Sequence, residues 1–105
     1  KKNKYFNFSN ITFVSELNFK NFIFEYFVDF RNSVINEKID LYKSVFINQS
    51  NFSNCTFKKR AILNGSKFKS ITVFVKSKFI DQVDLMKVLQ IHGFILLKKQ
   101  CHLFY

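Results

Sequence analysis

The side chains that could serve as nucleophiles, acid–base groups or metal ligands are few in this 105-residue chain. His92, Cys101 and His102 lie near the C-terminus, and the last twenty residues contain no Asp or Glu. A metal site needs three or four ligands at compact spacing, and a catalytic thiol needs a neighbouring base. We therefore predict that these three residues pack or face solvent, and that the chain holds no metal.

The other reactive side chains follow a sequence repeat. Asp29, Asp40 and Asp84 occupy a position at multiples of eleven residues where Asn is equally common. Such short side chains bond neighbouring backbone N–H groups, so we expect turn residues rather than acid–base pairs. Cys55 falls among small residues and is expected to act as a small hydrophobic residue. The sequence thus predicts no enzyme, no cofactor and no small-molecule substrate.

The charge balance points to anionic partners. Seventeen Lys and Arg against seven Asp and Glu give a net charge of +10, and no acidic residue lies between Leu41 and Ile80. Nucleic acid, anionic lipid and acidic proteins are the partners that such a balance favours. Val73, Val75 and Ile80 are expected to face outward and add an apolar component suited to a membrane. The candidate anion-binding residues are Lys58, Lys67, Lys69, Lys76 and Lys78.

Large apolar residues recur at two interleaved series of positions, each with a step of eleven. The first series is Phe8, Phe19, Phe30, Leu41, Phe52, Leu63, Phe74 and Leu85. The second series is Phe13, Phe24, Ile35, Phe46, Phe57, Phe68 and Phe79, with Gln90 at the eighth position. We expect these fifteen Phe, Leu and Ile residues to form the core of a repeat protein.

The spacing within each repeat favours strands. On a helix, steps of five and six would place the two series on nearly opposite sides, which excludes a right-handed helical supercoil. A small or apolar residue two positions before each large one fits the alternation of a strand. Within the first series, every second position is Phe, at Phe8, Phe30, Phe52 and Phe74, whereas three of the four positions between and after them are Leu. Because stacked positions favour like shapes, a coil of about twenty-two residues is predicted.

A coil of that length places charged residues in outward columns. One column would contain Glu16, Lys38, Arg60 and Gln82. Its acidic and basic members alternate along part of its length, so we expect them to neutralise each other in part. Exposed pairs of this kind contribute only about 0.2–1 kcal/mol each.

Units such as Val28-Asp29-Phe30-Arg31-Asn32 and Ser50-Asn51-Phe52-Ser53-Asn54 resemble pentapeptide repeats, in a variant with one extra residue after every second unit. The resemblance covers residues 6–93. It implies an all-β fold, a right-handed quadrilateral β-helix of about four coils with the large apolar residues inside. Phe6 and Phe22, at positions where the family has small residues, and Gln90, at a position where it has Leu or Phe, predict irregular first and last coils.

The two ends are expected to cap the array. Residues 1–5 are basic and would blunt the first coil. Residues 94–105 depart from the repeat and are predicted to be a cap with a short helix or the start of a truncated segment. Phe104 and Tyr105 suggest a docking or dimer contact, so a protein partner or a homodimer through one end of the array is expected.

The functional prediction is a non-catalytic structural or protein-interaction scaffold of the pentapeptide-repeat type. Some members of that family imitate DNA with an acidic cylinder, and a chain at +10 has the wrong sign for that role. The alternative is binding of the basic surface to nucleic acid or an anionic membrane. We expect weak, sequence-independent binding to polyanions, because Lys58 and Lys78 lie half a turn from Lys67 and Lys69. The predicted location is cytoplasmic, or peripheral on the inner face of a membrane.

Overall fold

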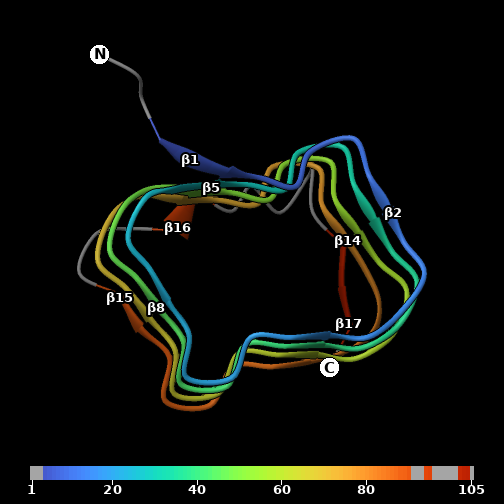
Figure 1. The fold of residues 1–105 in the computed structure, drawn as a ribbon. Helices are drawn as coiled ribbons and strands as arrows, with labels where there is room; N and C mark the ends of the chain where they lie inside the picture. The colour runs from blue at the N-terminus through green and yellow to red at the C-terminus, as the bar shows by residue number, and fades with distance from the viewer. Residues whose placement is uncertain (1–3, 91–93, 96–101, 105) are drawn as a thin grey trace.

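The computed structural model describes residues 4–90, 94–95 and 102–104, which contain seventeen short strands and no helix. The strands form a β-solenoid of about four coils, each of roughly 22 residues. Each coil has four faces, and successive coils stack around one closed outline (Figure 1). All pairings are parallel, as in the register Phe13↔Ile35 and Ile35↔Phe57. This confirms the all-β solenoid and the coil length predicted from the repeat.

The first face contains β1 (Tyr5–Asn7), β5 (Phe27–Asp29), β9 (Ser50–Asn51), β13 (Thr72–Val73) and β16 (Phe94–Ile95). The second face contains β2 (Thr12–Phe13), β6 (Val34–Ile35), β10 (Thr56–Phe57), the start of β14 (Lys78–Asp84) and β17 (His102–Phe104). The third face contains β3 (Leu17–Asn18), β7 (Ile39–Asp40), β11 (Ala61–Ile62) and the end of β14. The fourth face contains β4 (Ile23–Phe24), β8 (Val45–Phe46), β12 (Lys67–Phe68) and β15 (Leu89–Gln90).

The expected C-terminal helix is absent from the described part of residues 94–105, which forms strands instead. β16 pairs with β13 of the preceding coil in the register Thr72↔Phe94. β17 pairs with β14 through Lys78↔His102 and Gln82↔Phe104, with a shift of register between these pairs. The edge of the last full coil offers unpaired backbone N–H and C=O groups. Hydrogen bonds to these groups favour strands more than the spacing of the apolar residues favours a helix. Residues 96–101 and 105, and with them Cys101 and Tyr105, lie outside the described part.

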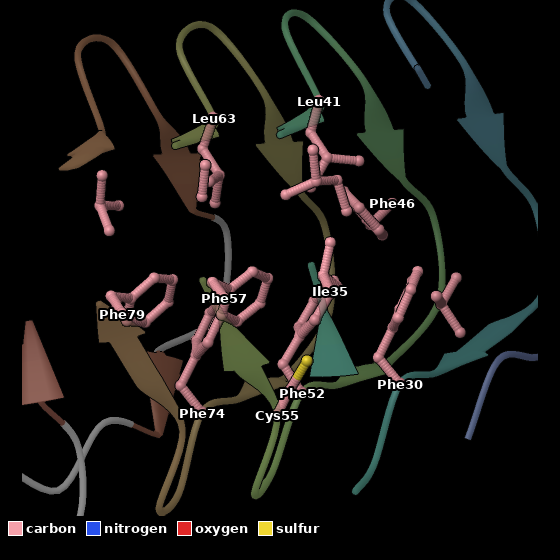
Figure 2. Close-up of a cluster of buried hydrophobic side chains, with 14 of the residues drawn as sticks. Phe30, Ile35, Leu41, Phe46, Phe52, Cys55, Phe57, Leu63, Phe74 and Phe79 are labelled. Carbon is pink, nitrogen blue, oxygen red and sulfur yellow. The ribbon is translucent and has the colours of Figure 1, made fainter. Parts of the chain in front are cut away.

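The large apolar residues of the repeat stack in columns inside the solenoid (Figure 2). The ring centroids of Phe46 lie 4.7 Å from Phe24 and 4.6 Å from Phe68, with nearly parallel planes. Four of the fifteen predicted core residues are only half-buried and belong to the first or last coil: Phe8, Phe13, Phe19 and Leu85. The eleven buried ones are Phe24, Phe30, Ile35, Leu41, Phe46, Phe52, Phe57, Leu63, Phe68, Phe74 and Phe79.

A turn with a left-handed residue follows the first series of core residues in every repeat. The left-handed residues have φ between 52° and 70°, and they are Asn10, Asn21, Asn32, Lys43, Asn54, Gly65, Lys76 and Lys87. In the turn from Leu41 to Ser44, the Ser44 N–H donates to the Leu41 carbonyl at 3.0 Å. A positive φ at the third residue only is the signature of a type II turn, which favours Asn and Gly there. This turn lengthens every second unit and produces the eleven-residue rhythm.

Small polar residues follow these turns and point inward. Ser44, Ser66 and Ser77 are fully buried, yet each hydroxyl donates to the carbonyl three residues earlier, at 2.8, 2.6 and 2.8 Å. A buried hydroxyl costs stability unless it is hydrogen-bonded, so these bonds make the polar positions tolerable. The small column leaves the interior volume to the Phe and Leu columns beside it.

Candidate functional site

The aspartates act as turn residues. The Oδ1 atoms of Asp29 and Asp40 accept the N–H of the residue two positions later, at 2.9 and 3.0 Å. Asn7, Asn18 and Asn51 do the same at equivalent positions. This confirms the turn role for Asp29 and Asp40.

Two aspartates also bind arginines. Burial alone would raise the pKa of Asp29, but the hydrogen bonds and charge of Arg31 outweigh it and hold that pKa below its usual value. The Arg31 guanidinium donates to both carboxylate oxygens, at 2.9 and 2.7 Å. Asp84 instead accepts from the Arg60 Nε at 2.8 Å and from the Gln82 amide. With its pKa held low in this way, Asp29 stays ionised and is a poor proton donor.

The cysteine and histidine candidates form no reactive cluster in the described residues. Cys55 is fully buried, and burial raises the pKa of its thiol to about 12, so the nucleophilic thiolate is suppressed. No three His, Cys, Asp or Glu side chains gather as metal ligands in that part of the chain. The predictions for His92 and Cys101 fall outside it. His102 lies on β17, and its side chain is likewise outside the description.

The five candidate anion-binding lysines are exposed but do not share one surface. Lys58 and Lys78 lie on the second face, where they line a shallow hollow with Asn36, Glu37, Thr56, Lys59 and Ile80. Lys67 and Lys69 lie on the fourth face, on the opposite side of the coil. Lys76 is the left-handed residue of the turn between the first and second faces. The separation of the two lysine pairs by half a coil is as the repeat predicted.

Ion pairs partly neutralise the third face. Lys38 lies 4.0 Å from Glu16 of the preceding coil, as their places in one outward column predict. Arg60 lies beside Gln82 in the strand register, as the column predicts, but its ion pair is with Asp84, two residues further on. The expectation that Arg60 is neutralised within its own column is therefore wrong. The longer arginine side chain reaches along the strand to a carboxylate that is mostly shielded from water. The third face therefore carries both positive and negative side chains, and its electrostatic potential has no single sign.

The apolar residues expected outside are unevenly exposed. Val73 and Val75 are half-buried, whereas Ile80 is 54% exposed on the second face. They therefore do not form one apolar face. The sequence reasoning missed a larger set on the fourth face, where Ile23 is 56% exposed and Leu89 is 50% exposed. Reading the outward positions coil by coil would have found it.

In the part of the chain that the structure describes, no strand covers the core at the N-terminal end of the solenoid. Ile11 and Phe22 occupy inward positions, yet they are 39% and 42% exposed. The residues that follow them in their columns, Ser33 and Ser44, are fully buried. The strands of this first coil, β1 to β4, each lie at the edge of their ladder, and among the described residues they pair only with the second coil. Unpaired strand edges around an apolar centre are an arrangement that pairs readily with another chain.

Comparisons with protein-family models, curated proteins and solved structures find no match to this chain. No helix capable of crossing a bilayer occurs in the part of the chain that the structure describes.

Proposed function

We propose that this chain is a non-catalytic protein-interaction scaffold of the pentapeptide-repeat type. The family assignment is supported by the four-faced coil of about 22 residues and by the recurring Asx and type II turns. The absence of catalysis is supported by the roles of the candidate groups, since the aspartates bind backbone or arginine and Cys55 is buried as a thiol. The stacked core then serves to hold outer surfaces in fixed positions.

The observation that carries an interaction role is the uncovered N-terminal coil. Its end combines four strand edges with the exposed side chains of Ile11 and Phe22. We propose a second copy of the chain as the partner. An identical end presents the same outline, so head-to-head contact can oppose all four edges and both apolar centres at once. A two-fold axis across the contact makes the interface self-complementary, with the strands of the two copies antiparallel.

This proposal predicts self-association that strengthens with salt. Each copy carries a charge of +10, so the copies repel, and salt screens that repulsion while leaving the apolar contact intact. Ile11→Lys places an unpaired charge from each copy at the contact and should raise the dimer dissociation constant at least tenfold, because burying an unpaired charge costs more than the roughly 1.4 kcal/mol of a tenfold change. Sedimentation velocity over a range of protein and salt concentrations measures both effects.

Val14→Lys is the matched control. Val14 lies in the same coil and is 72% exposed on the outer surface, so the variant adds the same charge away from the proposed contact. It should change the dissociation constant less than about threefold, and thermal melts check that both variants fold. A monomer at every concentration and salt, or equal weakening by both variants, would show that the N-terminal end is not a self-association surface.

A further inference from the structure

The fourth face carries exposed aliphatic side chains interleaved with lysines. One outward column reads Ile23, Val45, Lys67 and Leu89, in the register of the β4, β8, β12 and β15 ladder. The residues two positions after the first three are Glu25, Ile47 and Lys69. From the adjoining type II turns we include Tyr42, Lys43, Met86 and Lys87. Lys20, Asn21, Asn64 and Gly65 of the same turns are left out, because Lys20 pairs with Asp40 and the other three carry neither a charge nor an apolar side chain. We call the eleven included residues the lysine–aliphatic face.

The charge on the lysine–aliphatic face is strongly one-sided. Glu25 is the only one of the chain's seven carboxylates that belongs to it, against Lys43, Lys67, Lys69 and Lys87. None of these four lysines lies within 4.0 Å of a carboxylate among the described residues. The Lys43 ammonium lies 5.4 Å from the centre of the Tyr42 ring. The face therefore attracts anions, unlike the third face with its ion pairs.

The strands and turns hold the side chains of the lysine–aliphatic face at regular positions. Parallel strands hold neighbouring column positions about 4.8 Å apart, so Ile47 and Lys69 lie side by side. The turns between the third and fourth faces project beyond the line of β8 and β15 (Figure 1). Exposed apolar side chains thus occur both along the face, at Ile23 and Leu89, and on the ridge beside it, at Met86.

The mixture of side chains discriminates between anionic partners. Single-stranded nucleic acid is held by aromatic side chains on which bases stack, and Tyr42 is the only aromatic residue on this face. Aliphatic side chains make no favourable contact with the phosphate backbone of a nucleic acid. In contrast, an anionic bilayer surface takes up shallowly inserted apolar side chains while its headgroups attract lysines. We propose that the lysine–aliphatic face docks the solenoid on an anionic lipid surface.

This proposal does not depend on dimer formation through the N-terminal coil. The two surfaces meet only at β4, whose backbone edge belongs to the N-terminal end while the Ile23 side chain belongs to the lysine–aliphatic face. Salt also has opposite effects on them, because screening weakens attraction to lipid. Ile11→Lys should therefore leave lipid binding in place. Either proposal can fail while the other stands.

The test is co-sedimentation of the whole chain with phosphatidylcholine vesicles that contain or lack phosphatidylserine. We expect the chain to bind only to the vesicles that contain phosphatidylserine. The Lys67→Glu/Lys69→Glu variant should weaken this binding at least tenfold, because each lysine near such a surface contributes a factor of about five. The matched control is Lys58→Glu/Lys78→Glu, which changes the net charge equally on the opposite face and should weaken binding less than about threefold.

A second pair of variants tests the aliphatic contribution. Ile23→Ser alters the lysine–aliphatic face, whereas Ile80→Ser alters the second face at nearly the same exposure, 56% against 54%. Ile23→Ser should weaken vesicle binding about threefold or more, and Ile80→Ser should leave it unchanged. Equal losses in the two lysine variants would overturn the assignment to this face. Binding to single-stranded DNA but not to vesicles would overturn the lipid assignment.

Discussion

Replacing Phe46 with Ala should lower the free energy of unfolding by about 3–5 kcal/mol, the usual range for a buried Phe. Phe46 is fully buried, and its ring stacks between those of Phe24 and Phe68 at 4.7 and 4.6 Å. Truncation leaves a cavity in the middle of a column, where neither neighbour can move without disturbing its own strand pairing. Urea unfolding followed by far-ultraviolet circular dichroism measures the change.

The adjacent outward position supplies the control. Ile47 is 42% exposed, and Ile47→Ala should cost less than about 1 kcal/mol. The comparison that decides is therefore between the losses of unfolding free energy in Phe46→Ala and Ile47→Ala. If Phe46→Ala and Ile47→Ala destabilise equally, the assignment of inward and outward positions on the fourth face is wrong.

Replacing Ser66 with Leu should lower the free energy of unfolding by about 2–4 kcal/mol, the sum of two effects. Ser66 is fully buried beside the Phe and Leu columns, and Ser44 occupies the equivalent position in the preceding coil. A larger side chain overpacks this column, at about 1–3 kcal/mol. The substitution also removes the hydroxyl that donates to the Leu63 carbonyl at 2.6 Å, which contributes about 1 kcal/mol.

Ser66→Ala separates these two effects. It removes the hydroxyl but adds no volume, and the Leu63 carbonyl keeps the Ser66 N–H at 3.0 Å as a donor. We therefore expect a loss of about 1 kcal/mol for Ala in the same urea titration. A Leu variant that is as stable as the Ala variant would show that the column has room for a larger side chain, which contradicts a tightly packed interior.

The interior could be predicted from the sequence because each coil repeats the same physical problem. Phe30, Phe52 and Phe74 recur once in every coil, and their rings stack at 5.2 and 4.9 Å. A local pattern of this kind fixes a strand, a turn and an inward side chain together. The turn role of Asp29 followed from the same repetition.

The ends could not be predicted in this way, because their partners are not repeated. Phe94 continues the register of the first face in β16, although the sequence after Gly93 loses the core pattern. His102 pairs with Lys78 in a ladder whose register is shifted, and the residue spacing within this segment does not predict that register. Exposure of Ile11 likewise depends on whether another coil covers it, which is a property of the stack rather than of the residue.

The outer faces were predicted in part. The opposite placement of Lys58 and Lys67 follows from coil length alone. The pairing of Arg60 with Asp84 depends on side-chain reach, which the column pattern does not contain. The lysine–aliphatic face was missed because outward residues were read by charge along the chain, whereas neighbours on a solenoid are one full coil apart, as Val45 and Lys67 are.

Both proposed surfaces depend on the length of the coil, and disulfide trapping tests it most directly. Val34 and Thr56 are register partners on the outer side of the second face, so Val34→Cys/Thr56→Cys brings two thiols within the usual Cα separation of a disulfide. Val34→Cys/Val45→Cys is the control, because those residues are half a coil apart and lie on opposite faces. With Cys101→Ser in both backgrounds, mild oxidation and peptide mass spectrometry should find the intramolecular disulfide in the first variant only. A disulfide between positions 34 and 45, with none between 34 and 56, would contradict the coil.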